Sequence, residues 1–169
     1  MRPAVRGPVC LLACLVLSLS LAAQKPQPGL LNAEDLKRAV PTGYFFAGQS
    51  APVELRNAAG FRTADGKLVL AGLVDTSGYA ADVQQKYQGF FITETKVNVG
   101  GSDLAPGAYG FGFTKDGKFI VMDVAANDLF SVASSSDDKL AHPVPLKMRE
   151  DGGSYRLYHG RSFVTVNTQ

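Results

Sequence analysis

Tryptophan is absent from this sequence, and cysteine occurs only as Cys10 and Cys14. Both cysteines lie in an apolar N-terminal segment that we expect to be removed, so the processed chain has no thiol for a disulfide, a nucleophile or a metal site. Histidine is also scarce: His142 and His159 lack the i, i+4 or short-loop spacing of a specific metal pair. The sequence therefore predicts no metal, no cofactor and no cysteine chemistry.

An excess of charge of either sign is missing as well. Residues 1–23 read as a secretory signal peptide: Arg2 and Arg6 come first, residues 9–21 are almost wholly apolar, and small residues follow at the cleavage site. Two of the 17 Lys and Arg residues leave with this segment, so 15 basic residues face 15 acidic ones and the formal charge is zero. This balance gives no electrostatic reason to expect nucleic acid or an anionic membrane as a partner.

Two alternatives to signal cleavage remain open at the N-terminus. A membrane anchor needs about 20 apolar residues, and this run is shorter. Residues 11–14 resemble a bacterial lipobox, which would place a lipid on Cys14. With cleavage after Ala22 or Ala23, we expect a protein exported to the periplasm or beyond, without a membrane span.

Long amphipathic helices are not predicted for the remaining chain. Pro26 and Pro28 mark an extended linker over residues 24–31, and residues 32–169 form one predicted β domain. Asn32 is placed to cap a short helix over residues 33–40, which Pro41 ends. It is the only substantial helix that we expect, although residues 82–88 fit either a helical turn or the approach to a strand.

Strand signals dominate from Gly43 onward. Residues 68–74 contain no polar side chain, which predicts a central strand covered on both faces. In residues 97–124, read as consecutive antiparallel strands, Tyr109, Phe111 and Phe113 alternate with two glycines. The rings therefore share a core face, and the other face is bent or closely approached. Residues 49–52 read as a break.

Two hairpin turns, residues 63–67 and 114–118, match at four of five positions. Gly66 and Gly117 are expected at positive φ, as tight hairpins require. An internal duplication explains the match, and so does independent selection of similar residues by two Asp-Gly turns. Neither explanation is excluded by so short a match.

The fold class that follows is all-β: an antiparallel β-barrel or β-sandwich of about eight to ten short strands with one short N-terminal helix. Gly72, Gly110 and Gly112 favour a curved, barrel-like sheet. The strand pattern alone does not separate the two architectures.

No arrangement of side chains specifies a catalytic site. Ser50 lacks the last glycine of a nucleophile elbow, and Ser77 has the setting of an ordinary turn residue. Asp75 and Asp123 end the two most apolar strands and could meet at one rim, near Asp128, for acid–base work or calcium binding. Strand-end aspartates are also ordinary turn formers. Five tyrosines could line a ligand surface or belong to the core: Tyr79, Tyr87, Tyr109, Tyr155 and Tyr158.

Three segments carry a resemblance to a known family. Residues 44–57, 64–79 and 104–110 together resemble an uncharacterised family of secreted bacterial proteins of acidobacterial type. The resemblance covers nearly the whole processed chain, and it implies export but no activity and no site residues. Residues 104–109 also resemble a hairpin of another β family of unknown function.

Our sequence-based hypothesis is a secreted or periplasmic, non-enzymatic β domain. It binds a small apolar ligand or a cell-envelope partner, and the ligand residues that we expect are Leu70, Tyr109, Phe111 and Phe113. The alternative is a hydrolase that uses a rim carboxylate or His159. No catalytic residue is assigned, and the oligomeric state stays open.

Overall fold

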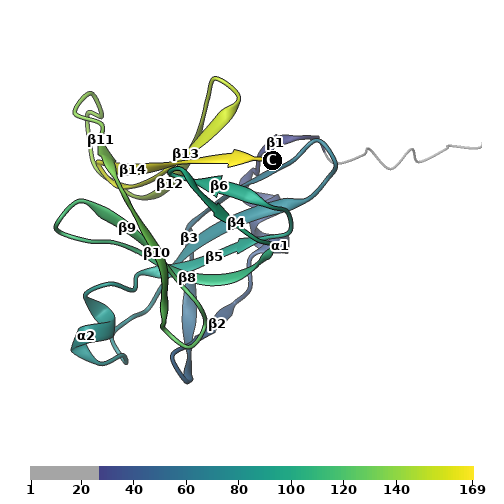
Figure 1. Ribbon diagram of the computed structural model, residues 1–169. Coiled ribbons are helices and arrows are strands. Elements are labelled where there is room, and N and C mark those ends of the chain that lie inside the picture. Colours follow the sequence, from purple (N-terminus) through teal and green to yellow (C-terminus); the bar gives the residue numbers. More distant parts are fainter. Residues whose placement is uncertain (1–26) are drawn as a thin grey trace, which may run out of the picture.

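The computed structural model describes residues 27–169 (Figure 1). The predicted signal peptide, both cysteines and the start of the predicted linker lie outside the described residues. Two antiparallel sheets form two layers, with the six-stranded sheet uppermost in Figure 1 and the eight-stranded sheet beneath it. Among the described residues, no helix is both long and apolar enough to cross a membrane.

The eight-stranded sheet has the order β1-β3-β4-β5-β8-β9-β10, with β2 paired to β3 off this path. Its strands are β1 (Gly29–Leu30), β2 (Gly43–Phe46), β3 (Gln49–Arg62), β4 (Leu68–Val74), β5 (Gly89–Thr93), β8 (Gly107–Phe113), β9 (Lys118–Met122) and β10 (Asp128–Ala133). The helices α1 (Ala33–Ala39) and α2 (Ala81–Gln84) lie between its strands in the sequence.

The six-stranded sheet has the order β12-β13-β14-β6-β7, with β11 paired to β14. Its strands are β6 (Val97–Val99), β7 (Ser102–Leu104), β11 (Ser135–Ser136), β12 (Val144–Asp151), β13 (Ser154–Gly160) and β14 (Ser162–Thr168). The β6–β7 hairpin is inserted between β5 and β8, which are neighbours in the other sheet. Residues 97–124 are therefore consecutive antiparallel strands, as predicted, but they belong to two sheets.

The all-β prediction is confirmed, and the architecture is sandwich-like. Over residues 27–169 both sheets have open ends and form no closed barrel, so of the two predicted architectures the structure has the sandwich and not the curved, barrel-like sheet that the glycines favoured. The described strands number eight plus six rather than eight to ten, and there are two helices rather than one. The extra strands include β1, β7 and β11, which are too short to show a period of two.

The glycines that suggested curvature serve a close approach instead. A Cβ on Gly110 would overlap the Phe46 ring, and a Cβ on Gly112 would overlap the backbone carbonyl of Lys86. Both contacts are on the face of β8 opposite its three rings. This arrangement confirms the prediction of a closely approached rear face.

Local predictions match the structure at several places. The range of β4 is as predicted, and β4 lies between β3 and β5. Asn32 accepts a hydrogen bond of 2.9 Å from the N–H of Asp35 and caps α1. Gly66 and Gly117 have φ of 90° and 76°. The predicted break at residues 49–52 was wrong, because β3 runs through Pro52, opposite Gly43 of β2.

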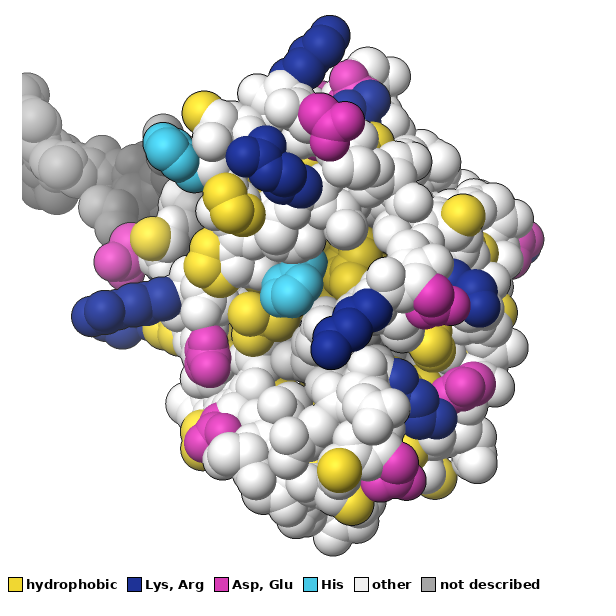
Figure 2. All heavy atoms as spheres, turned by 90° about the vertical axis from the view of Figure 1, so that its left-hand side faces the viewer, with side chains coloured by type: hydrophobic (Ala, Val, Ile, Leu, Met, Phe, Trp, Pro, Cys, Tyr) yellow, Lys and Arg dark blue, Asp and Glu magenta, His cyan; other side chains and the backbone are white. Residues whose placement is uncertain are grey.

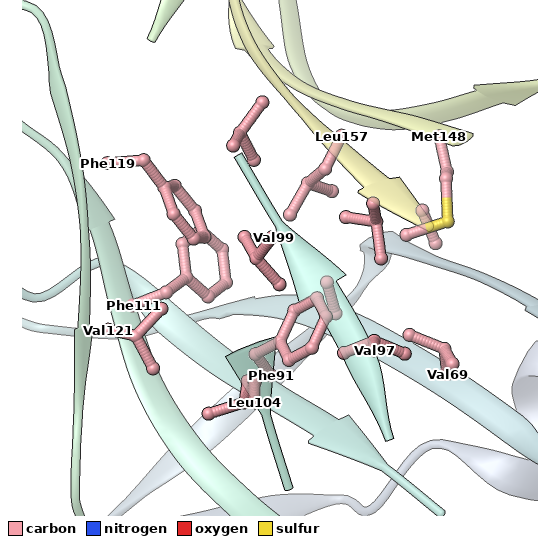
Figure 3. Close-up of a cluster of buried hydrophobic side chains, with 14 of the residues drawn as sticks. Val69, Phe91, Val97, Val99, Leu104, Phe111, Phe119, Val121, Met148 and Leu157 are labelled. Atoms are coloured by element: carbon pink, nitrogen blue, oxygen red, sulfur yellow. The ribbon is translucent and has the colours of Figure 1, made fainter. Parts of the chain in front are cut away.

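Two hydrophobic cores lie on the two faces of the eight-stranded sheet. The inner core fills the space between the sheets, where side chains of both converge (Figure 3). Its fully buried members include Phe61, Val69, Phe91, Val97, Val99, Phe111, Phe119, Val121, Leu157 and Val166. The outer core lies under α1, β2 and the α2 segment, and comprises Val40, Tyr44, Phe46, Ala51, Leu70, Val74, Tyr79, Tyr87, Phe90 and Met122.

Candidate functional site

The four predicted ligand residues lie on opposite faces of one sheet. Tyr109, Phe111 and Phe113 point from β8 into the inner core, and Phe111 is fully buried against Phe119, with ring centroids 5.5 Å apart. Leu70 belongs to the outer core and is 4 % exposed. The structure therefore brings the three rings together and separates them from Leu70.

One of these residues, Phe113, also borders an open cleft of about 880 Å³ between the α2 segment and the β8–β9 turn. The Gln88 side chain holds this part of β8, because its amide donates to the Phe113 carbonyl and accepts from the Phe113 N–H, both at 2.9 Å. The other walls are polar and carry both signs of charge: Asp82, Lys86, Lys115 and Asp116.

His159 stacks on the inner side of Phe113, with ring centroids 5.8 Å apart and an interplanar angle of 21°. Burial lowers the pKa of His159 below its ordinary value of 6.5. Figure 2 shows the side of the molecule that faces left in Figure 1. Charges of both signs are interspersed there, and hydrophobic side chains gather around a histidine.

The other residues considered for catalysis have structural partners. The carboxylate of Asp75 accepts from the Ser77 N–H at 3.0 Å, and that of Asp123 accepts from the Ala125 and Asn127 N–H groups, each at 2.9 Å. Side-chain hydrogen bonds from Ser77 and Asn127 respectively, and then these backbone hydrogen bonds, lower the pKa of the two carboxyls. Asp128 forms an ion pair of 2.6 Å with Lys86.

The remaining candidates are placed as follows. Ser50 lies in β3 opposite Phe45 of β2, and His142 is exposed before β12. Within residues 27–169, no three His, Cys, Asp or Glu side chains are grouped closely enough to hold a metal ion.

A second hollow region, which the sequence did not predict, lies beside α1. It begins with an irregularity of β3, which pairs with β4 at Val53 and again from Ala58, so that residues 54–57 have no partner in β4. This segment carries Leu55, which is 42 % exposed, beside α1. A β-bulge of this kind redirects side chains away from the regular pleat.

Two adjoining hollows of about 250 Å³ and 320 Å³ follow from this arrangement, and we call them together the α1 groove. They share Leu36 and Ala58. The first is lined by Leu30, Leu31, Leu36, Ala58, Ala59, Gly60, Leu146, Lys147 and Met148, and the second by Ala33, Glu34, Leu36, Lys37, Leu55, Arg56 and Ala58. The side chains along the groove are mostly apolar.

Charge is distributed unevenly around the α1 groove. Lys37, Arg56 and Lys147 are exposed at its border, and Glu34 is its acidic member. The apolar surface continues outward through Leu30, which is 47 % exposed. The groove therefore combines an apolar bed with an excess of positive charge.

Sequence reasoning missed this groove for identifiable reasons. Leu30 was assigned to the linker, whereas Gly29–Leu30 form β1 against Arg62 and Phe61. Residues 53–56 alternate apolar and charged side chains, which predicts a strand with Leu55 on its apolar face. The irregularity of β3 exposes Leu55 instead. No local sequence pattern predicts the pairing of Leu30 in β1 or the exposure of Leu55.

The outer core contains a group of tyrosines that carries two unpaired polar atoms. The hydroxyls of Tyr44 and Tyr87 are buried without a hydrogen-bond partner among the described residues. The Tyr87 ring stacks on Phe46 with centroids 3.8 Å apart. Burial raises the pKa of Tyr44 to about 12, and burial also raises that of Tyr87.

Comparison with known proteins adds no family to these observations. No protein-family model, no curated protein and no solved structure matches this chain.

Proposed function

We propose that this protein is an extracytoplasmic, non-enzymatic binding domain whose ligand is an amphiphile with an apolar chain and an acidic head group. The ligand lies in the α1 groove. The observation that carries the proposal is the combination of an apolar bed, from Leu30, Leu36 and Leu55, with a border that has three cationic side chains and one acidic one.

The size and shape of the groove support a ligand of this kind. Ligand pockets in proteins commonly measure about 300–1,000 Å³, and the two adjoining hollows measure about 250 and 320 Å³. An elongated apolar chain can pass from one hollow to the other across Leu36 and Ala58. A bulky, rigid ligand does not match two shallow, connected hollows.

The space between the sheets offers less support as a binding site. Phe91, Phe111 and Phe119 are fully buried there against side chains of the opposite sheet. A guest in that space would have to displace packed side chains, and each large side chain removed from a core costs about 3–5 kcal/mol. A surface groove requires no such rearrangement.

Binding of dodecanoate, dodecanol and dodecylamine to the purified protein tests the proposal. We expect dodecanoate to bind with a Kd in the micromolar range, about −8 kcal/mol, and to raise the melting temperature by mass action. Dodecanol should bind more weakly, and dodecylamine most weakly because of the cationic border. Calorimetric titration and thermal-shift measurements report both effects.

Two exposed leucines provide a matched pair of variants. Leu55→Asp places a charge in the groove and should abolish dodecanoate binding, whereas Leu129→Asp, at a leucine that is 48 % exposed on β10, should leave it unchanged. Arg56→Glu should weaken dodecanoate severalfold without affecting dodecanol. The absence of a thermal shift with all three compounds, or equal effects of the two leucine variants, would contradict the proposal.

Export is tested separately, by the intact mass of the protein recovered from its native host. Cleavage of residues 1–23 predicts a chain that begins near Ala23 or Gln24. A mass that includes Cys14 with an attached lipid would replace the free, exported domain with a membrane-anchored lipoprotein.

A further inference from the structure

The strand β10 ends the eight-stranded sheet and pairs only with β9. Strands at a sheet edge present unpaired backbone groups and invite pairing with another chain. Proteins protect such edges with charged residues, proline, β-bulges or very short strands. The composition of each edge of this sandwich therefore indicates whether it is protected.

The other path ends carry recognisable protection. β1 has only two residues. β7 has three, and its Asp103 forms a 2.7 Å ion pair with Lys96. β12 is longer but contains Pro145 and exposes Lys147 and Arg149. Of the strands off these paths, β11 has two residues and β2 has four, and the N–H of Ala47, next to β2, is bonded to the Val124 carbonyl.

β10 has one protective feature, a register shift against β9 between Asp128 and Phe130, but from Phe130 to Ala133 it pairs regularly and has the composition of a central strand. No charge and no proline occurs from Leu129 to Ser136. Phe130 and Val132 are partly buried against the inner core, and Leu129 and Ala133 are exposed on the other face. A strand that is apolar on both faces normally has both faces covered, and here Leu129 and Ala133 are left exposed.

We infer that β10 is the interface of a symmetric dimer, in which β10 of a second copy of this chain pairs antiparallel with it and joins the two eight-stranded sheets. The sequence of β10 is self-complementary about Ser131. Pairing centred there places Phe130 opposite the partner's Val132, and the regularly paired part of the strand, from Phe130 to Ala133, crosses the two-fold axis. Asp128 then faces the partner's Ser134, so no two carboxylates oppose each other, and like charges directly opposite would be destabilising.

The geometry of a two-fold axis at Ser131 gives a specific test. Ser131 is exposed, so replacing it affects the monomer little, yet in the dimer each substituted side chain lies opposite its own copy. Ser131→Lys and Ser131→Asp should each raise the dimer dissociation constant at least about tenfold, by repulsion between like charges. An equimolar mixture of the two variants should restore dimers, because lysine then faces aspartate.

Sedimentation velocity from micromolar to millimolar protein measures these equilibria, and circular dichroism confirms that each variant is folded. Thr168→Lys is the control. It adds the same charge at an exposed position of β14, which is flanked by β13 and β6, and should leave the dimer unchanged. Amide hydrogen exchange in β10 should slow as the wild-type concentration rises.

Three results would overturn the inference. A wild-type protein that stays monomeric at millimolar concentration has no such interface. Dimers that persist unchanged in Ser131→Lys use another surface. A mixture of the two charged variants that stays monomeric excludes the register centred on Ser131. None of these results bears on ligand binding at the α1 groove, which the dodecanoate titration measures independently.

Discussion

The two faces of the eight-stranded sheet are covered in different ways. The inner face meets a second sheet. The eight-stranded sheet contributes phenylalanine, valine and alanine side chains to this core, and the facing sheet contributes mostly valine and leucine. The outer face meets short elements, namely α1, β2 and the α2 segment, and its core is rich in tyrosine. Two of these tyrosine hydroxyls, on Tyr44 and Tyr87, are buried and unpaired.

This difference follows from what a sheet and a short element can each supply. A facing sheet presents a regular array of side chains, so apolar groups can be matched along its whole length. A helix of seven residues and a four-residue strand cover only parts of the opposite face. The rest of the outer face is covered by large aromatic rings and by close contacts with two glycines of β8. The Phe46 ring approaches Gly110, and the Lys86 carbonyl approaches Gly112. We expect the inner core to be the less adaptable of the two.

Removal of one ring from each core gives the largest expected effect. Phe111 and Phe46 are both fully buried, the first in the inner core and the second in the outer core. Phe111→Ala should cost about 4–5 kcal/mol of unfolding free energy and Phe46→Ala about 3, because the short outer elements can close part of the cavity. Denaturant titrations measure both. An equal or greater loss for Phe46→Ala would show that the outer face is packed as rigidly as the inner one.

The close approach on the outer face is tested by Gly112→Ala. The added methyl group would overlap the Lys86 carbonyl, and overpacking of this kind costs about 1–3 kcal/mol. Gly117→Ala in the adjoining turn is the control: it has φ of 76° and no atom within 4 Å of an added Cβ, so only backbone strain of about 1 kcal/mol is expected. If the Gly112 variant is no less stable than the control, the outer layer moves freely.

The unpaired hydroxyls predict a smaller effect of unusual sign. Tyr87→Phe removes a buried hydroxyl that has no partner, so stability should stay constant or rise by up to about 1 kcal/mol. In Tyr158→Phe a hydroxyl that donates to the Asp137 carboxylate at 3.1 Å is lost, and stability should fall by about 1 kcal/mol. Thermal unfolding compares the two variants. A loss in Tyr87→Phe as large as that in Tyr158→Phe would mean that the Tyr87 hydroxyl is paired in solution.

The smallest expected effect comes from the ionisation of Tyr44. It leaves stability unchanged at neutral pH and lowers it only in alkali. Burial raises the pKa of Tyr44 from 10.0 to about 12, so the folded state favours the protonated form. The resulting stabilisation is complete below pH 10 and is lost as the pH rises through about 12. Stability measured against pH should therefore fall less steeply over this range in Tyr44→Phe than in the wild type. Identical curves would show that Tyr44 titrates as if exposed.

Features that depend on neighbouring residues were predictable from the sequence. The Asn32 cap, the positive φ of Gly66 and Gly117, and the apolar run of β4 each follow from local chemistry. Pro52 misled the prediction because it was taken to end a strand. In the structure it lies next to the irregular part of β3, where a proline is tolerated.

Features that depend on pairing between distant residues were not predictable. A period of two shows that Phe111 and Phe113 share a face, but it does not relate that face to the face of Leu70 in another strand. Only the register, in which Leu70 pairs with Ile92 and Phe91 pairs with Tyr109, decides that they are opposed. The α1 groove needs the irregularity of β3 and the approach of β12, and neither is visible in a local pattern.

The pairing of β14 with β6 has a consequence for biosynthesis. Val166, Asn167 and Thr168 pair with Val99, Asn98 and Val97, so the β6–β7 hairpin gains its neighbour in the sheet only when β14 has been made. A chain emerging from the ribosome can assemble β3, β4, β5, β8 and β9 earlier, and one side of that sheet stays uncovered meanwhile. Long-range pairing of this kind slows folding and prolongs the exposure of apolar surface. The nascent chain should therefore depend on chaperones until β14 is synthesised.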